Sequence, residues 1–336
     1  NQVTALPSHS ITPYRDLINR WHLEKKNPSL AISEPLEPIV WWLENTTPDA
    51  YRESIRQGVL AWNEAFEKAG FKNAIVVKDQ PLDATWNAGD VRYNVLRWTS
   101  SPNPPFGGYG PSFSNPRTGQ ILSADIMLED IYVSNRVRSD SIFTPDEPSS
   151  TLLNQRGLSA KHCLASFNIA RGNALGRISA AVLGNQAATS RMVQESLYEL
   201  TLHEVGHTLG LNHNMRGSQL VDNDKIHDAS QTKGIISSSV MDYSAVNLAP
   251  PGREQGDFYT THPGPYDVWA IQFGYDPDLE GVSRTAHLAR SAEPSLAFGN
   301  DADDMRSVGR AIDPKINIGD MSSDAVGYAS DRFALL

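Results

Sequence analysis

The sequence predicts an α/β or α+β fold, and three observations support that prediction. The chain has 336 residues, of which 40% are apolar and 20% charged, a composition typical of a globular protein with one large or two modest domains. One segment carries the three- and four-residue apolar spacing of a helix, whereas several others are short and have the residue pattern of strands. No repeat of fixed period is present, which excludes solenoids and propellers.

The first part of the chain predicts a strand, a helix and then further strands. Residues 1–38 are interrupted by prolines and indicate an extended arm that leads into a strand at 39–43. Thr47 and Pro48 are typical of a helix start, and apolar residues follow at steps of three and four until Gly70. The remaining strands are expected at 74–78, 91–98 and 121–129.

The pattern is less regular between residues 130 and 190. A helix is expected around 160–170, and Gly172, Gly176 and Gly184 are expected to break it. This stretch suggests no function.

The most informative segment reads HEVGHTLGLNH and begins at His203. Apolar residues upstream share one helical face, which predicts a helix over 192–209 and places His203 and His207 one turn apart. Gly210 can adopt the positive φ that turns the chain, so that His213 returns as a third ligand. Three neutral imidazoles suit zinc and leave its fourth position for water.

Glu204 follows the first predicted ligand on the same helix. Zinc lowers the pKa of a bound water towards about 7, so that a nucleophile exists at neutral pH. The carboxylate of Glu204 can reach that water without binding the metal. We therefore expect Glu204 to accept the proton of the water and to deliver it to a leaving amine.

This long motif resembles the zinc-binding motif of the metzincin clan of zinc endopeptidases, in which a methionine-containing turn follows. The segment SVMDY at 239–243 is similar to that turn. The resemblance implies that Met241 lies beneath the imidazoles. By resemblance to the astacin and serralysin branches, Tyr243 ligates zinc at rest and hydrogen-bonds the oxyanion during the reaction.

The resemblance also implies the arrangement of the fold. A twisted mixed sheet with long helices is expected to face an irregular, mostly helical lower half across an active-site cleft. The segments GYGP at 108–111 and RTGQILSADI at 117–126 resemble the clan's edge-strand region, along which an extended substrate pairs. An ordinary sheet strand is the alternative. The residues expected to contact the substrate there are Ser123, Ala124, Asp125 and Ile126. The segment 265–275 resembles the clan's C-terminal helix.

From about Ser33 onward the chain resembles a family of large exported bacterial proteins that carry a metzincin-like catalytic module. This resemblance implies a periplasmic or extracellular location and a longer parent chain. The chain begins at Asn1 without a methionine, which is consistent with a fragment or a mature form. The residue after the third ligand is Asn214, whereas the best-known branches have Ser, Glu, Asp or Pro at this position. The substrate specificity of those branches is therefore not assumed for this chain.

The resemblance suggests a division of the chain into three parts. Residues 1–38 form an N-terminal arm. Residues 39–275 form the protease domain, with an upper half at about 39–212 and a lower half at about 213–275. Residues 276–336 form a C-terminal extension packed on, or following, the catalytic domain.

Composition excludes several other classes of protein. The chain carries 29 Lys and Arg against 39 Asp and Glu, and the net charge of -10 argues against nucleic acid as a partner. Cys163 is the only cysteine, which excludes an intramolecular disulfide and zinc sites built from several thiolates. No run of apolar residues approaches the roughly 18 that a membrane-spanning helix needs.

Two weaker signals concern calcium and the remaining histidines. The acidic runs 222–224 and 301–304 could supply oxygen ligands to a structural calcium, although solvated turns are the simpler interpretation. The histidines without a partner at ligand spacing are interpreted as non-catalytic; they are His9, His22, His162, His227, His262 and His287.

The leading hypothesis is a zinc-dependent endopeptidase that hydrolyses extended polypeptides. Two alternatives stay open: a zinc-containing binding or adhesion module that has lost proteolysis, and a zinc hydrolase of a non-peptide amide. The presence of Glu204 argues against the first alternative, because a module without catalysis has no need of the base.

Overall fold

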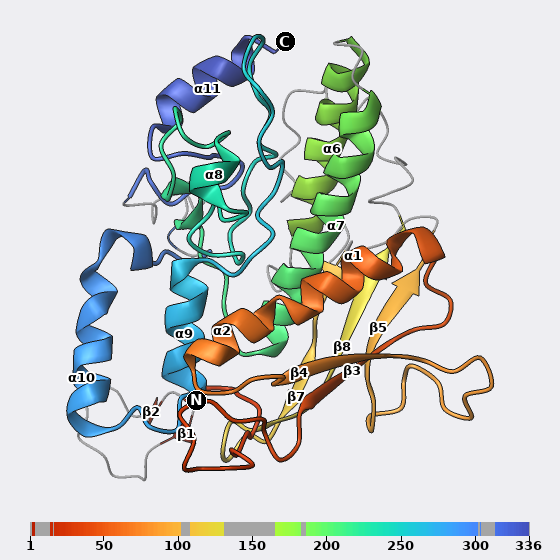
Figure 1. Ribbon diagram of the computed structural model, residues 1–336, viewed down its shortest axis with the longest axis vertical. Helices are drawn as coiled ribbons and strands as arrows, with labels where there is room; N and C mark the ends of the chain where they lie inside the picture. Colours follow the sequence, from red (N-terminus) through yellow and green to blue (C-terminus); the bar gives the residue numbers. More distant parts are fainter. Residues whose placement is uncertain are drawn as a thin grey trace.

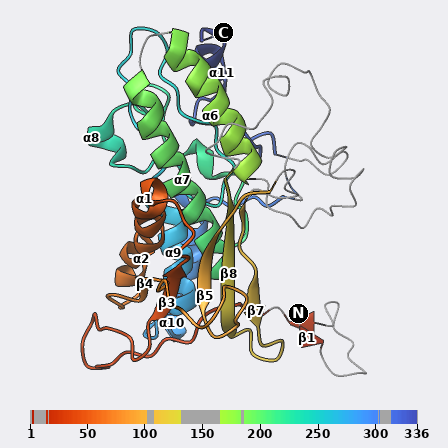
Figure 2. The same ribbon diagram turned by 90° about the vertical axis from the view of Figure 1, so that its right-hand side faces the viewer.

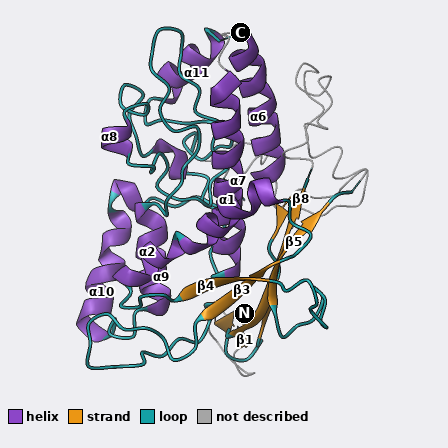
Figure 3. Ribbon diagram, turned by 45° about the vertical axis from the view of Figure 1, so that its right-hand side comes forward, coloured by secondary structure: helices purple, strands orange, loops and turns teal. Residues whose placement is uncertain are grey.

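The computed structural model describes residues 2–3, 14–15, 17–101, 108–130, 165–182, 186–301, 303 and 313–335. In the described part, a mixed sheet with helices on one face adjoins a second half in which loops connect short helices (Figures 1 and 3). The predicted α+β fold is thereby confirmed. Cys163, His9, His162 and Gly184 lie outside the described residues.

The main sheet has six strands in the order β4-β3-β5-β8-β6, with β7 also paired to β8. Its strands are β3 (Ile39–Leu43), β4 (Ile75–Asp79), β5 (Asn94–Thr99), β6 (Gly108–Tyr109), β7 (Ser112–Ser114) and β8 (Ile121–Glu129). Strands β3, β4, β5 and β8 run parallel, whereas β6 and β7 run antiparallel to β8. A separate two-stranded pair joins β1 (Gln2–Val3) and β2 (Tyr14–Arg15).

Strand β8 is an inner strand, contrary to the role predicted for it. On one side Asp125 and Ile126 pair with β5, and on the other Ser123 and Ala124 pair with β7. The prediction that these four residues pair with a substrate is therefore wrong, because neighbouring strands already occupy both sides of β8. Strands β6 and β7, at 108–114, form the outer edge of the described sheet next to β8.

The predicted first helix is present as two consecutive helices, α1 (Asp49–Leu60) and α2 (Trp62–Lys68). Its apolar stripe faces the core, where Trp62 is fully buried. The start of the helix differs from the prediction, because Pro48 occupies the N-cap position and no side chain caps the helix. The Thr47 hydroxyl is buried without a hydrogen-bond partner.

Helices α6 (Ala165–Val182) and α7 (Gln186–Thr208) lie side by side as a hairpin, and α7 also packs on α1 (Figure 2). Gly172 and Gly176 lie inside α6 and do not break it, contrary to expectation. They allow close packing instead, since a Cβ added at Gly176 would lie closer than 3.0 Å to the sulfur of Met192. The packing gained at these positions offsets the low helix propensity of glycine.

The second half of the molecule contains short helices joined by long loops. They are α8 (Ala229–Thr232), α9 (Pro265–Tyr275), α10 (Gly281–Ala289) and α11 (Ala325–Phe333), together with 3-10 turns at Gly217–Gln219, Arg290–Ala292 and Pro294–Leu296. Helix α9 coincides with the segment that resembles the clan's C-terminal helix. None of the helices in the described part is long and apolar enough to cross a bilayer.

The end of the chain contributes to the core of this second half. Met321 and Tyr328 pack with Ile226, Ile236 and Ala245 in a hydrophobic cluster separate from the main core. Residues beyond 276 are thus integrated with the segment that follows the zinc-binding motif. The domain boundary drawn at 275 stays a prediction.

Candidate metal centre

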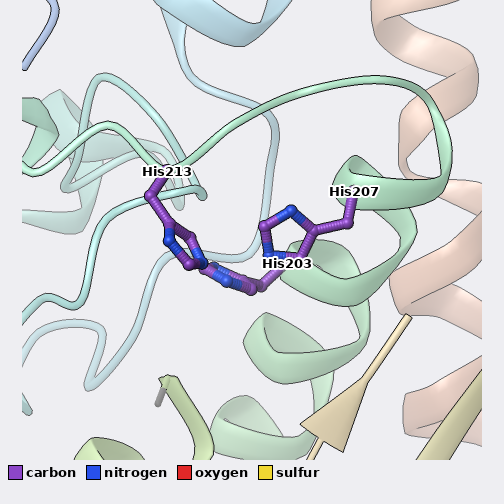
Figure 4. A group of neighbouring side chains, drawn as sticks. All are labelled: His203, His207 and His213. Carbon is purple, nitrogen blue, oxygen red and sulfur yellow. The ribbon is translucent and has the colours of Figure 1, made fainter. Parts of the chain in front are cut away.

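Helix α7 and the turn that follows it bring the three predicted ligands together. His203 and His207 lie one turn apart on α7, and the Gly210 N–H donates back to the His207 carbonyl where the helix ends. Gly210 has a φ of +97°, a conformation that side chains with a Cβ rarely adopt. Beyond this turn the chain returns, and His213 faces the two imidazoles of the helix (Figure 4).

The geometry of the three imidazoles fits a metal ion. Their ligand atoms all lie within 4.8 Å of one another. Each ring nitrogen Nδ1 lies within hydrogen-bond distance of an oxygen: His203 with Val240 O at 2.7 Å, His207 with Leu211 O at 3.1 Å, and His213 with Asp301 Oδ2 at 2.8 Å. Carbonyl and carboxylate oxygens only accept here, so Nδ1 carries the proton and Nε2 is the nitrogen whose lone pair would bind a metal.

The surroundings keep two of these imidazoles neutral, as metal binding requires. Burial, followed by the neighbouring His207 and His213, lowers the pKa of His203 well below its usual value. Burial and His213 also lower the pKa of His207 to about 3. Near neutral pH, a metal therefore does not displace a proton from either ligand of the helix.

Tyr243 lies beside the third histidine. Its hydroxyl donates to His213 Nε2 at 3.0 Å, and its ring centroid is 4.8 Å from that of His213 and 5.6 Å from that of His203. The ring is nearly buried, with 3% of the residue exposed. The hydroxyl is thus held beside the nitrogen that would bind the metal.

The turn at 239–243 packs under α7. Met241 is fully buried, and its sulfur packs against Gly206 of the helix. The Met241 carbonyl accepts a hydrogen bond from the Asn214 N–H at 3.0 Å, which ties this turn to the residue after the third ligand.

Asp267 on α9 holds the same turn, a role that the sequence did not reveal. Its buried carboxylate accepts from Ser239 Oγ at 2.6 Å, from Val240 N at 2.8 Å and from Gly264 N at 2.9 Å. Burial raises the pKa of Asp267 to about 6. Because Val240 O is the acceptor for His203, Asp267 supports the first ligand indirectly. An acidic residue in the first turn of a helix that begins with proline was the available signal.

Glu204 lies on the side of α7 that faces β6. It is fully buried, and a Cβ added at Gly110 would lie 3.3 Å from its Oε2. The backbone of the outer strand β6 and the loop after it thus pass directly over the carboxylate.

An open pocket of about 230 Å³ lies beside two of the imidazoles. It is bounded by the N-terminal arm, the outer edge of the sheet and the turn after α7. Its lining residues are Asn19, Tyr109, Gly110, Ser112, His207, Gly210, Leu211, Asn212 and His213. The only ionisable side chains in this lining are Tyr109 and the two histidines.

The weaker sequence signals lie elsewhere or have other partners. In the described residues, the three histidines are the only group of three or more candidate ligands arranged for a metal. Asp224 is 3.5 Å from Arg253, and the Asp301 carboxylate lies on His213. A structural calcium at either acidic run stays a prediction. The described histidines outside the metal centre are His22, His227, His262 and His287.

The fold and the site together define a metal centre of the zinc-hydrolase type. Two histidines on one helix and a third histidine after a glycine turn form its donor set, and Glu204 follows the first of them on the helix. Residues 185–336 match the family model described as Met-zincin, which confirms the resemblance to the metzincin metalloproteases. The matching segment contains the three ligands, Glu204 and Tyr243, and the match implies zinc metalloprotease activity in general. Neither a curated protein nor a solved structure matches the chain.

Proposed function

We propose that the chain is a zinc-dependent endopeptidase that cleaves extended polypeptides. The observation that carries this proposal is the grouping of the three imidazoles, whose ligand atoms lie within 4.8 Å of one another and whose Nδ1 atoms each face an oxygen acceptor, so that Nε2 is the nitrogen that would bind a metal. The donor set suits zinc, which three neutral histidines bind while a fourth position stays open.

Zinc bound there would supply a Lewis acid that makes a water nucleophilic near neutral pH and polarises the scissile carbonyl. Glu204 accepts a proton from the attacking water and passes it to the departing amine nitrogen. The Tyr243 hydroxyl donates a hydrogen bond to the carbonyl oxygen as negative charge develops on it. Met241 belongs to the methionine turn that supports the imidazoles from below.

The substrate binds along the outer edge formed by β6 and β7. In the described part of the sheet these two strands pair with β8 on one side only, so that an extended peptide can add on the other. This edge passes over Glu204 and also supplies Tyr109, Gly110 and Ser112 to the pocket beside the imidazoles. A peptide paired there would present its carbonyl groups next to the metal centre.

The proposed location is periplasmic or extracellular, with the chain as the catalytic part of a longer polypeptide. The resemblance to exported bacterial proteins supports both statements. Fractionation of the producing cells tests the location, and recovery of the protein only from the cytoplasm would contradict it.

The activity is tested with the purified chain, its zinc content and an unstructured substrate such as casein. We expect a chelator to abolish cleavage and zinc to restore it. Glu204→Gln should retain zinc and lower turnover by about 10²–10⁴-fold, because the amide cannot accept the proton. The control Glu67→Gln alters an exposed glutamate on α2 and should cleave normally.

Two results would contradict the proposal. Zinc binding without any peptide cleavage would favour a binding module, and cleavage confined to small non-peptide amides would favour the other hydrolase. Full turnover in Glu204→Gln would remove this residue from the mechanism.

A further inference from the structure

The third ligand is oriented differently from the other two. His203 and His207 donate their Nδ1 protons to backbone carbonyls, whereas His213 donates to the carboxylate of Asp301 at 2.8 Å. His213 also lies beyond the end of α7, so that no helix fixes its ring. Among the described residues, the side chain hydrogen-bonded to its Nδ1 comes from a segment 88 residues further along the chain.

The segment that carries Asp301 is fixed to the residues after the third ligand. Asn214 is fully buried; its Oδ1 accepts from the Gly299 N–H at 3.0 Å, and its Nδ2 donates to the Ala297 carbonyl at 3.1 Å. The Met215 N–H donates to the Gly299 carbonyl at 2.7 Å. Three hydrogen bonds thus hold the 297–299 segment beside His213, two residues before Asp301.

A stacking contact also supports the same segment. Phe298 stacks on Tyr266 of α9 with a centroid distance of 5.7 Å and an interplanar angle of 21°. Tyr266 precedes Asp267, which holds the methionine turn. Helix α9 therefore contacts both the loop under His203 and the segment that leads to Asp301.

We propose that Asp301 is a positioning residue for the metal and that Asn214 holds it in place. The carboxylate fixes the tautomer and the ring orientation of His213 and increases the basicity of Nε2, as carboxylate partners of metal-bound histidines do. The C-terminal segment that carries Asp301 is then part of the metal centre, and Asn214 connects this segment to the residues that follow His213. This inference rests on the proposed zinc site but concerns its affinity and geometry.

The test measures the zinc dissociation constant by competition with a chromophoric chelator. Asp301→Ala should weaken zinc binding by about 10–100-fold, and Asp301→Asn by less, because an amide oxygen still accepts from Nδ1. The matched control is Asp303→Asn, which removes the same charge from the same segment. In the described residues the Asp303 carboxylate accepts from the Asn300 N–H at 3.3 Å and has no hydrogen bond to His213, and the amide oxygen of the variant can keep the bond to Asn300, so the control should bind zinc as the wild type does. The visible spectrum of the cobalt-substituted protein should change in Asp301→Ala and not in the control.

A double-mutant cycle tests the role of Asn214. Asn214→Ala should weaken zinc binding in the otherwise wild-type protein. In the Asp301→Ala background it should cause little further loss of zinc affinity, because the hydrogen bonds of Asn214 act on the metal through Asp301. Asp301 is 52% exposed in its side chain, so its substitution should leave the thermal unfolding of the zinc-free protein unchanged. This measurement separates positioning from folding.

The possible results distinguish this inference from the proposed function. If the wild-type chain binds no zinc, both fail. If the wild type binds zinc and Asp301→Ala binds it equally tightly with an unaltered cobalt spectrum, only the role of Asp301 is overturned. An equal loss in Asp301→Ala and Asp303→Asn would also overturn it, because the effect would then be that of charge alone.

Discussion

The carboxylate of Glu204 packs directly on the backbone of Gly108. A Cβ added at Gly108 would lie closer than 3.0 Å to Glu204 Oε1, so any larger residue there must displace the carboxylate or the strand. The position of the proposed base is therefore set by the same strand that we propose to bind the substrate. This relationship makes the glycine a sensitive test of both roles.

Gly108→Ala should lower turnover without loss of zinc. The added methyl group forces the carboxylate or β6 to move, and a misplacement of about 1 Å can reduce catalysis by about 100-fold. Turnover and zinc content are measured on the same preparation. Gly274→Ala is the control, because a Cβ at Gly274 meets nothing within 4 Å. Normal turnover in Gly108→Ala would show that the carboxylate is not held by β6.

Tyr243→Phe should lower turnover more than it lowers zinc content. The hydroxyl donates to His213 Nε2 and, in the proposed mechanism, turns to the developing oxyanion; loss of such a donor costs about 10²–10³ in kcat. Tyr51→Phe removes a hydroxyl from α1, where the ring of Tyr51 stacks on Trp98, and serves as the control. An unchanged kcat in Tyr243→Phe would exclude the hydroxyl from the reaction.

Asp267→Ala should destabilise the protein strongly. It leaves three buried donors without their acceptor, and each buried unsatisfied group costs about 1–3 kcal/mol, so that the free energy of unfolding should fall by about 3 kcal/mol or more. Asp267→Asn should lower the free energy of unfolding by less, because the amide oxygen can still accept hydrogen bonds from these donors.

Denaturant unfolding of the zinc-free protein measures these effects. The exposed Asp83→Ala is the control and should unfold like the wild type. A loss in Asp267→Ala no larger than that in Asp83→Ala would mean that the turn does not depend on this carboxylate.

Local sequence patterns were sufficient where the partners lie close together in the chain. His203, Glu204 and His207 fall within about one helical turn, so that their spacing alone predicts a shared metal site. The helix at 265–275 was expected from its resemblance to the clan's C-terminal helix, and the proline at its first position is a local feature that agrees with this expectation.

Contacts between distant segments could not be read from the sequence. Asp301 is 88 residues from His213, and an acidic run looks the same whether it faces solvent or an imidazole. The residue pattern of β8 does not tell whether it is an inner or an outer strand. Alternation shows which face of a strand is buried, and it does not show which strands pair with it. The glycines of α6 were misjudged for a related reason: helix propensity is local, whereas the packing against Met192 that favours Gly176 is not.

The ion pair between His262 and Glu64 should make stability depend on pH. His262 Nδ1 lies 2.8 Å from Glu64 Oε1 and links the loop before α9 to helix α2. The hydrogen bond that His262 donates to the Glu64 carboxylate raises the pKa of His262 above its ordinary value of 6.5. The folded state therefore binds the proton more tightly than the unfolded state. The resulting stability is fully present below pH 6.5 and is lost as the pH rises through the folded-state pKa.

Glu64→Gln should remove this dependence. Both side chains are more than a third exposed, so the expected loss in unfolding free energy is under about 1 kcal/mol; it should appear at pH 6 and largely vanish at pH 8. Denaturant unfolding of the zinc-free protein at the two pH values measures the difference in unfolding free energy between the variant and the wild type. The contributions of the other titrating groups are the same in both proteins and cancel in this difference. His262→Gln should give the same result, because it removes the other member of the pair. An equal loss at pH 6 and pH 8 would show that the contact stabilises through packing or neutral hydrogen bonding and not through the charge of His262.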